Sequence, residues 1–158
     1  MVKIAFLFPG QGSQVVGMAK EFYNSSLESR KLFDQAAAVL GFDIADLCFN
    51  GPSDKLMLTE NAQPALLIHS TIALNMLREN GINADVAAGH SLGEYSANVA
   101  AGSIQYLDAV RLVHLRGRFM QEAVPVGIGG MAAVIGLPLA SIRLLCDKVS
   151  KKDFLVQP

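Results

Sequence analysis

Short apolar runs alternate along the 158-residue chain with longer segments in which hydrophobic residues recur at helical spacing. The run over residues 3–8, which Pro9-Gly10 ends, predicts a buried strand, and residues 85–89 predict a second strand. Residues 131–135 predict a third strand, and the apolar segment from residue 154 onward predicts the start of another. Strands that alternate with helices in this way favour an α/β fold with a parallel sheet.

Polar capping residues and glycines set the expected helix boundaries. Ser25 and Glu28 fit a capping box, which predicts a helix that Gly41 ends. Asn61 is expected to cap a helix that Gly81 ends. Further helices are predicted from near Ser13, from the residue after Ser91 through Ala100, from Ser103 to about Ala123, and over residues 139–149.

Pro125 and the glycines at 127, 129 and 130 interrupt the helical pattern, which predicts a domain boundary. We expect residues 1–125 to form one domain and residues 126–158 to begin a second, smaller lobe. Residues 127–132 match the Gly-x-Gly-x-x-Ala pattern of dinucleotide-binding loops. A helix precedes them where that motif needs a strand, so we interpret them as a hinge.

Residues 89–93 read Gly-His-Ser-Leu-Gly and lie between a predicted strand and a predicted helix, the arrangement of a nucleophile elbow. A tight turn needs small residues on both sides of the serine, and Gly89 and Gly93 supply them. The turn also brings the first backbone N–H groups of the helix beside the hydroxyl. We therefore predict Ser91 as a nucleophile and the Leu92 N–H as an oxyanion donor. The alternative is a serine that only caps the helix.

None of the three histidines is predicted to be the general base. His90 adjoins Ser91, but neighbouring side chains on a tight turn point in different directions, and a base must reach the hydroxyl. We expect His90 to pack under the turn. His69 and His114 lie inside predicted helices and are interpreted as structural.

A glycine-rich loop over residues 9–14 follows the first strand, and such loops present backbone N–H groups to anions. A phosphate-binding loop is excluded because Met18 stands where that motif requires lysine. A dinucleotide fingerprint is excluded because Val15 occupies the third glycine position. Two interpretations stay open: the loop supplies a second oxyanion donor, or it is a plain tight turn.

Arg116 projects from the apolar face of its predicted helix. Its neighbours three, four and seven positions away are apolar: Ala109, Leu112, Val113, Phe119 and Met120. A buried guanidinium needs a carboxylate, which its planar fork binds bidentately. That carboxylate belongs either to a ligand or to an Asp or Glu of the protein, unless the side chain reaches solvent instead.

Composition narrows the picture further. Hydrophobic residues make up 51% of the chain and charged residues 17%, which is typical of a globular protein. The formal net charge of -1 lacks the basic excess of a nucleic-acid-binding protein. Cys48 and Cys146 match no disulfide or metal-ligand pattern, which favours a cytoplasmic location. The first apolar run is too short for a signal peptide and residues 64–77 are too short to span a membrane, so we expect a soluble protein.

Four segments of the chain, taken together, resemble one known family. They are Phe-Pro-Gly-Gln-Gly-Ser-Gln at 8–14, Gln-Pro-Ala-Leu at 63–66, Gly-His-Ser-Leu-Gly-Glu-Tyr-Ser at 89–96, and Arg-Gly-Arg-Phe-Met-Gln at 116–121. In this order they are similar to the motifs of the malonyl-CoA:acyl carrier protein transacylase family. The resemblance implies an α/β-hydrolase-like domain with a parallel sheet and an inserted ferredoxin-like lobe that begins near residue 131.

The resemblance also implies roles for individual residues. It assigns Ser91 to the acyl-carrying serine, the backbone N–H groups of Gln11 and Leu92 to the oxyanion hole, Arg116 to the arginine that pairs with the malonate carboxylate, and Gln63 to a polar position near the pocket. It further implies a CoA thioester as acyl donor and acyl carrier protein as acceptor, in fatty acid biosynthesis. Neither a cofactor nor a metal is expected.

Chains of this family continue well beyond position 158, and the histidine that activates the serine lies in that further part. No histidine of this chain is therefore assigned as the base, and the isolated 158 residues are expected to be catalytically impaired. Two alternatives to malonyl transfer stay open. One is a serine esterase or thioesterase, which uses the same elbow, and the other is an inactive fragment.

Overall fold

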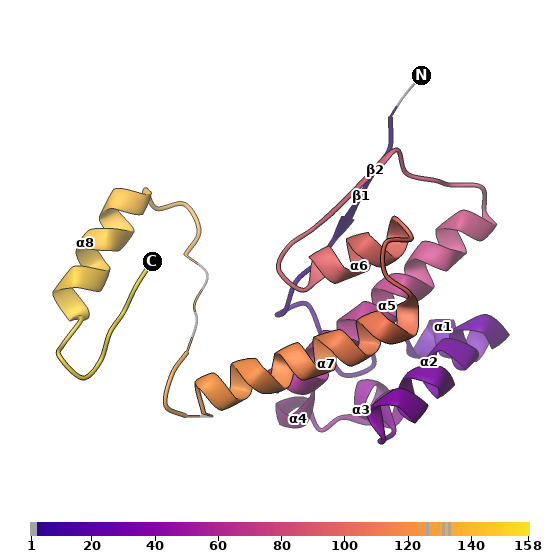
Figure 1. Ribbon diagram of the computed structural model, residues 1–158, viewed down its shortest axis with the longest axis horizontal. Coiled ribbons are helices and arrows are strands. Elements are labelled where there is room, and N and C mark those ends of the chain that lie inside the picture. The colour runs from indigo at the N-terminus through magenta and orange to yellow at the C-terminus, as the bar shows by residue number, and fades with distance from the viewer. Residues whose placement is uncertain (1–2, 126, 131, 133) are drawn as a thin grey trace. The chain divides into compact units, whose positions relative to one another are not determined.

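A computed structural model describes residues 3–125, 127–130, 132 and 134–158. The chain divides into two compact units, Met1–Pro125 and Val126–Pro158. The elements of the first unit are β1 (Ala5–Phe8), α1 (Lys20–Ser25), α2 (Leu27–Leu40), α3 (Ile44–Asn50), α4 (Ser53–Met57), α5 (Thr59–Glu79), β2 (Val86–Gly89), α6 (Gly93–Ala100) and α7 (Tyr106–Ala123) (Figure 1). The second unit contains α8 (Leu139–Val149). The assignment of residues 126–158 to a second lobe stays a prediction.

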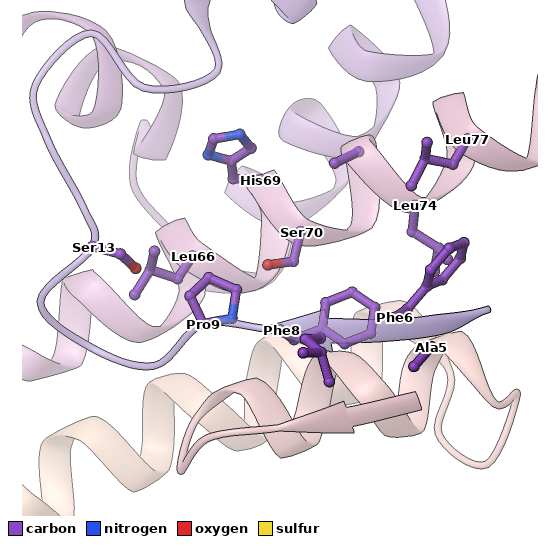
Figure 2. Close-up of a pocket in the computed structure, with 12 residues that line it drawn as sticks. Ala5, Phe6, Phe8, Pro9, Ser13, Leu66, His69, Ser70, Leu74 and Leu77 are labelled. Atoms are coloured by element: carbon purple, nitrogen blue, oxygen red, sulfur yellow. The ribbon is translucent and has the colours of Figure 1, made fainter. Parts of the chain in front are cut away.

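Strands β1 and β2 pair in parallel, with Ala5 opposite Val86. Alternate side chains of a strand point to opposite faces of the sheet. Phe6 and Phe8 pack against residues of α5 and α6, and Figure 2 shows β1 running beside α5. On the other face Leu7 is 77% exposed. The prediction of a buried strand is therefore wrong for this face, because nothing in the described residues covers it.

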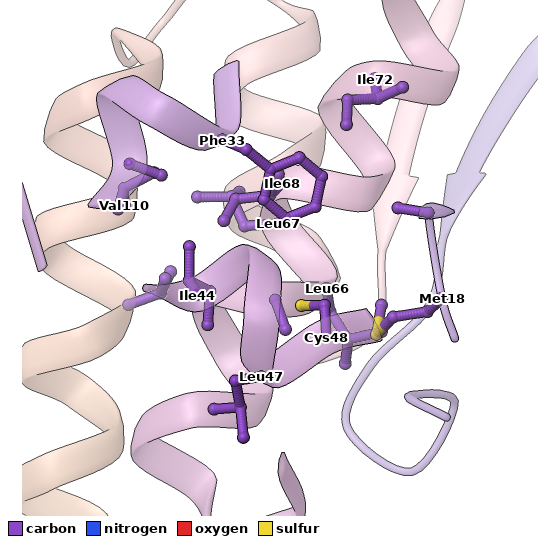
Figure 3. Packing of buried hydrophobic residues seen from close by; sticks show 14 of the residues in the cluster. Met18, Phe33, Ile44, Leu47, Cys48, Leu66, Leu67, Ile68, Ile72 and Val110 are labelled. Atoms are coloured by element: carbon purple, nitrogen blue, oxygen red, sulfur yellow. The ribbon is translucent and has the colours of Figure 1, made fainter. Parts of the chain in front are cut away.

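The main core forms where α2, α3, α5 and α7 meet (Figure 3). Each of these helices contributes large side chains that are 1% exposed or less: Phe33, Ile44, Leu67, Ile68 and Val110. Burying one such side chain contributes about 1.5–3 kcal/mol relative to leaving it in water. Helix α5 is buried along most of its length, and α7 packs along it. This pair of helices carries two of the predicted site residues.

Four predicted helix starts are wrong: those at Ser13, Ser25, Asn61 and Ser103. Helix α1 begins at Lys20 rather than near Ser13, because Gly12 and Gly17 adopt φ values of 108° and 95°, which a helix does not accommodate. Ser26, not Ser25, caps α2, and its hydroxyl accepts a hydrogen bond from the backbone N–H of Ser29 at 3.2 Å.

Asn61 does not cap α5, since that helix already begins at Thr59 and the Asn61 side chain donates to the carbonyl of Lys55. Ser103 precedes α7, whose N-cap is Gln105. The predictions that helices end at glycine agree better with the structure. Gly41 ends α2 with a φ of 79°, as expected for a left-handed C-cap.

The second unit confirms one prediction and corrects another. Helix α8 spans the predicted residues 139–149. Two positions of the strand expected over 131–135, residues 131 and 133, lie outside the described residues, and the other three are in no strand. Near the end of the chain, Lys151 and Phe154 form an isolated antiparallel bridge rather than the start of a strand.

None of the helices in the described residues combines the length and apolar character that crossing a membrane requires.

Candidate active site

The turn between β2 and α6 has the geometry of a nucleophile elbow. Ser91 is exposed and adopts a φ of 52°, in the left-handed region that residues other than glycine rarely occupy. Glycine is needed on both sides of it. A Cβ on Gly89 would collide with the backbone of Gly93, and a Cβ on Gly93 would collide with the carbonyl of Phe8. The turn therefore holds the backbone of Ser91 in a tightly constrained conformation, while the role of this serine as nucleophile stays a prediction.

The loop after β1 lies directly against this turn. The two strands are parallel neighbours, so their carboxyl ends meet at the same edge of the sheet. The His90 N–H donates to the carbonyl of Phe8 at 3.1 Å. A Cβ on Gly10 would lie 2.7 Å from both Nδ1 and the carbonyl oxygen of His90. The two glycine-containing loops, residues 9–14 and 89–93, therefore pack directly against each other.

Two backbone donors are available at this junction. Within the described residues, neither the N–H of Gln11 nor that of Leu92 forms a hydrogen bond. The Leu92 side chain is 1% exposed and belongs to the main core, which anchors the turn. Unpaired N–H groups on adjacent loops are what an oxyanion hole requires. Their assignment to that role stays a prediction.

Arg116 of α7 reaches the serine. Its Nη2 donates to Ser91 Oγ at 3.0 Å and its Nη1 donates to Gln63 Oε1 at 2.7 Å. The guanidinium carbon lies 5.8 Å from the centre of the Tyr95 ring. In the described part of the chain Arg116 forms no salt bridge with a carboxylate. The alternative that Arg116 forms a structural ion pair with an Asp or Glu is therefore not observed among the described residues. Its hydrogen-bond partners there, Gln63 and Ser91, are both neutral.

Gln63 continues this network into the protein. Its side chain is 0% exposed, and its Nε2 donates to Thr59 Oγ1 at 3.0 Å. The Thr59 hydroxyl in turn donates to Gln11 Oε1 at 2.7 Å. An unbroken series of hydrogen bonds thus runs from Ser91 through Arg116, Gln63 and Thr59 to the loop that carries Gln11.

Two residues of this network were not singled out from the sequence. Thr59 precedes Gln63 by four positions on α5, so the two share one helix face, and that spacing is the signal that points to it. Tyr95 lies in the same motif as Ser91, but nothing in the sequence indicates that its ring adjoins Arg116.

Helices α5 and α7 approach closely beside Arg116. A Cβ on Gly117 would lie 2.5 Å from the Cα of Glu60 and 2.6 Å from the carbonyl oxygen of Thr59. One turn earlier on α7, the Nδ1 of His114 donates to the carbonyl of Glu60 at 3.0 Å. The glycine and the histidine together hold the start of α5 against α7, which places Arg116 within reach of Gln63.

The histidines divide as follows. His114 has the structural contact described above, and half-buried His69 packs edge-on to Phe22 at 5.6 Å, with its pKa lowered by burial. The prediction that His90 packs under the turn is wrong, since His90 is exposed. Gly93 and the carbonyl of Phe8 already fill the space there. No hydrogen bond joins a histidine to Ser91 within the described residues.

Two pockets lie near these elements. One of about 430 Å³ adjoins Arg116 and is mainly apolar; it is lined by Tyr95, Leu112, Leu115, Arg116, Phe119, Met120 and Ala123. The other, of about 360 Å³, lies between β1 and α5 (Figure 2) and includes Phe6, His69 and Leu74. The first pocket borders Arg116, and the second is also lined by Pro9 and Ser13 of the loop that carries Gln11.

Neither cysteine chemistry nor a metal site is indicated. Burial, with a smaller contribution from Asp43, raises the pKa of the Cys48 thiol to about 12, so this thiol stays protonated and unreactive near neutral pH. In the part of the chain that the structure describes, no three His, Cys, Asp or Glu side chains converge on a metal position. That the protein works without metal or cofactor stays a prediction.

A serine on a strained turn between a parallel strand and a helix has the geometry found in enzymes with a serine nucleophile, and a cation contacts its hydroxyl here. The family described as acyl transferase domain matches residues 5–150. The chain belongs to this family.

Similar proteins carry a more specific name. The malonyl CoA-acyl carrier protein transacylase of Bacillus subtilis is 51% identical over 99% of this chain and 50% of its own length. The solved acyl-carrier-protein S-malonyltransferase of Bartonella henselae is 41% identical, with a TM-score of 0.87 over 97% of this chain and 50% of that one. A malonyl transacylase solved in complex with its type II polyketide acyl carrier protein is 44% identical, with a TM-score of 0.86 over 94% of this chain and 48% of that one. The chain spans about half the length of the curated relatives it matches.

Proposed function

We propose that the protein transfers a malonyl group from malonyl-CoA to the phosphopantetheine thiol of acyl carrier protein, through a malonyl ester on Ser91. The observation that carries the proposal is the 3.0 Å contact between Arg116 Nη2 and Ser91 Oγ, made by a guanidinium with no carboxylate partner among the described residues. An acyl group that ends in a free carboxylate satisfies both residues at once. The names of the relatives, including the one bound to a carrier protein, support this reaction.

The transfer takes place in two displacement steps. In the first, Ser91 Oγ attacks the thioester carbonyl carbon, the carbon–sulfur bond breaks, and CoA leaves as a thiol that has received the serine proton. In the second, the carrier protein thiol attacks the ester carbonyl carbon, the bond to Ser91 Oγ breaks, and the thiol proton returns to the serine. The N–H groups of Gln11 and Leu92 stabilise the oxyanion of each step. The resemblance places the base that carries these protons, a histidine, beyond residue 158.

Arg116 selects the acyl group. Its fork donates two hydrogen bonds to a malonyl carboxylate, whereas an acetyl group leaves the charge without an anionic partner. Gln63 holds the Nη1 side of the fork at 2.7 Å while the other side turns to the substrate. Gln63 is therefore proposed as a substrate-site residue that acts mainly by orienting the arginine.

We further propose the finer description of the fold and the setting. Residues 1–125 form the first part of an α/β-hydrolase-like domain, and residues 126–158 begin a ferredoxin-like lobe. The parallel pairing of β1 and β2 around the elbow supports the first assignment. The protein acts in the cytoplasm on a CoA thioester, in fatty acid biosynthesis, without a cofactor.

A serine esterase or thioesterase has the same turn but needs no cation at the hydroxyl. The family match and the position of Arg116 support acyl transfer over hydrolysis and over an inactive fragment. Competition between water and carrier protein for the acylated enzyme separates the two reactions. Hydrolysis that carrier protein does not outcompete would favour the esterase.

The test is the intact mass of the natural polypeptide after incubation with malonyl-CoA or acetyl-CoA. We expect a malonyl adduct that disappears in Ser91→Ala. In Arg116→Ala, the malonyl-to-acetyl ratio of acylation rates should fall by about 30-fold or more, because a charge-assisted pair contributes ~2 kcal/mol or more. An adduct that persists in Ser91→Ala, or a ratio unchanged in Arg116→Ala, contradicts the proposal.

A further inference from the structure

We infer that Thr59 is a positioning residue that orients Arg116 toward the acyl carboxylate and ties it to the Gln11 loop. The inference rests on the proposed function, and it concerns a residue that carries no predicted role. Its basis is the set of hydrogen bonds from Arg116 to Gln63, from Gln63 to Thr59 and from Thr59 to Gln11.

The arginine determines the direction of the first two hydrogen bonds in this relay, which runs from Arg116 through Gln63 and Thr59 to Gln11. A guanidinium only donates, so Gln63 must turn its Oε1 toward Arg116 and its Nε2 toward Thr59. The Thr59 oxygen accepts from that amide and has one hydrogen left, which it donates to Gln11 Oε1 at 2.7 Å. The hydroxyl is therefore the one group in the relay that both accepts and donates through a single atom.

Burial makes the hydroxyl hard to replace. Gln63 is 0% exposed, so water does not take over its amide hydrogens. Its other contact is the sulfur of Met120 at 3.4 Å, a weak acceptor. Without the Thr59 oxygen, the amide cannot rotate to find another partner, because its Oε1 is held by Arg116. Loss of the Thr59 hydroxyl thus removes two hydrogen bonds of the relay and leaves the Gln63 amide without a strong acceptor.

The relay has a function during acylation. When the acyl carboxylate takes the Nη2 of Arg116 away from Ser91, the bond from Nη1 to Gln63 remains as the fixed point about which the guanidinium turns. Thr59 keeps that fixed point in place. The same hydroxyl holds the side chain of Gln11, whose backbone N–H is the proposed oxyanion donor. Loss of the Thr59 hydroxyl should therefore slow acylation by malonyl-CoA more than acylation by acetyl-CoA, because only the malonyl group has a carboxylate that binds Arg116.

The experiment compares Thr59→Val, which keeps the shape and removes the hydroxyl, with Thr59→Ser, which keeps the hydroxyl. Thr71→Val is the matched control, since Thr71 is also buried on α5 but donates only to the carbonyl of Leu67 within that helix. In the natural polypeptide, we expect Thr59→Val to lower the malonyl-to-acetyl ratio of kcat/KM for acylation about tenfold, the effect of one buried hydrogen bond. Thr59→Ser and Thr71→Val should keep the ratio within about twofold of the unchanged protein, because each leaves the relay intact.

A second measurement reads the relay without any acyl group. Side-chain amide signals of Gln63 and Gln11, observed by NMR in protein labelled with ¹⁵N-glutamine, should shift in Thr59→Val and not in Thr71→Val. If Thr59→Val does not fold, Thr59→Ala replaces it in both measurements. Unchanged amide signals, an unchanged ratio in Thr59→Val, or an equal loss in Thr71→Val overturns the inference. An unchanged protein that takes no malonyl group instead contradicts the proposed function, whatever the amide signals show.

Discussion

The guanidinium of Arg116 is bound by an amide oxygen and a hydroxyl oxygen, both of them neutral. A cation that is half-buried in this way has lost part of its hydration without gaining a counter-ion among the residues that the structure describes. A salt bridge within the protein would have stabilised it but would also have competed with a substrate. The neutral partners therefore favour a site that is completed by an anion from outside.

His69 provides a prediction on pH. Burial lowers the pKa of its imidazole below the ordinary value of 6.5, so the unfolded chain binds a proton at pH values where the folded chain does not. The free energy of unfolding therefore falls as the pH drops through about 6.5, the ordinary pKa of the unfolded chain's imidazole. Urea denaturation at several pH values between 7.5 and 5 measures it. His69→Gln should flatten the curve, and a variant with the same slope would show that other groups cause it.

At the scale of single residues, the sequence was sufficient where the chemistry depends on a local motif. The glycines at 89 and 93 indicate the turn of Ser91, and the structure shows the two backbone collisions that require them. The spacing of four positions from Gln63 points to Thr59, but its contact with Gln11, 48 positions away, could not be predicted because no local pattern reports it. The position of His90 was predicted wrongly for a related reason: the space under the turn is partly filled by Phe8 of β1, which is distant in the sequence.

Among the elements, the crossing of α5 and α7 decides where Arg116 lies. Gly117→Ala should reduce the free energy of unfolding by about 1–3 kcal/mol, because the added Cβ meets the backbone of Thr59 and Glu60 at 2.5–2.6 Å. The gain in helix propensity, about 1 kcal/mol, offsets only part of this loss. Urea denaturation measures the change.

Gly130→Ala is a control for the substitution itself, since a Cβ there meets no heavy atom of the described residues within 4 Å. It should leave the free energy of unfolding unchanged within about 0.5 kcal/mol. Equal effects of the two substitutions would mean that the crossing at Gly117 tolerates a wider separation.

The long helices α2, α5 and α7 and the strands β1 and β2 were predicted, whereas the first residues of these helices and the strand expected over 131–135 were not. Ser25 and Ser26 are both good capping residues, and the choice of Ser26 depends on α1, which ends at Ser25. Asn61 lost its predicted role because α4 ends at Met57 and leaves Thr59 to begin α5. Short helices such as α3 and α4 have too few turns to give a periodic signal.

For the molecule as a whole, the uncovered face of the sheet is an exposed apolar surface of the first unit. Leu7 is 77% and Val86 is 61% exposed. A net charge of -1 gives little repulsion between copies. We expect the 158-residue chain by itself to self-associate and to enhance the fluorescence of an apolar dye.

Sedimentation velocity over a range of concentrations tests this expectation. Leu7→Lys should reduce both association and dye binding, because a charge on an exposed strand discourages pairing. A monomer at every concentration, with no dye response, would contradict it.

The pairing of β1 with β2 has a consequence for the order in which the protein folds. Ile4 and Asp85, which are joined by a hydrogen bond at the start of the paired region, are 81 positions apart in the chain. Closing a loop of that length costs entropy that only later contacts offset, and such long-range parallel pairing is intrinsically slow. The five helices between the strands shorten that distance as they form and pack. We therefore expect the serine turn and the loop beside it, which need both strands, to be among the last parts of the first unit to assemble, so the proposed site at Ser91 should form only once the strands meet.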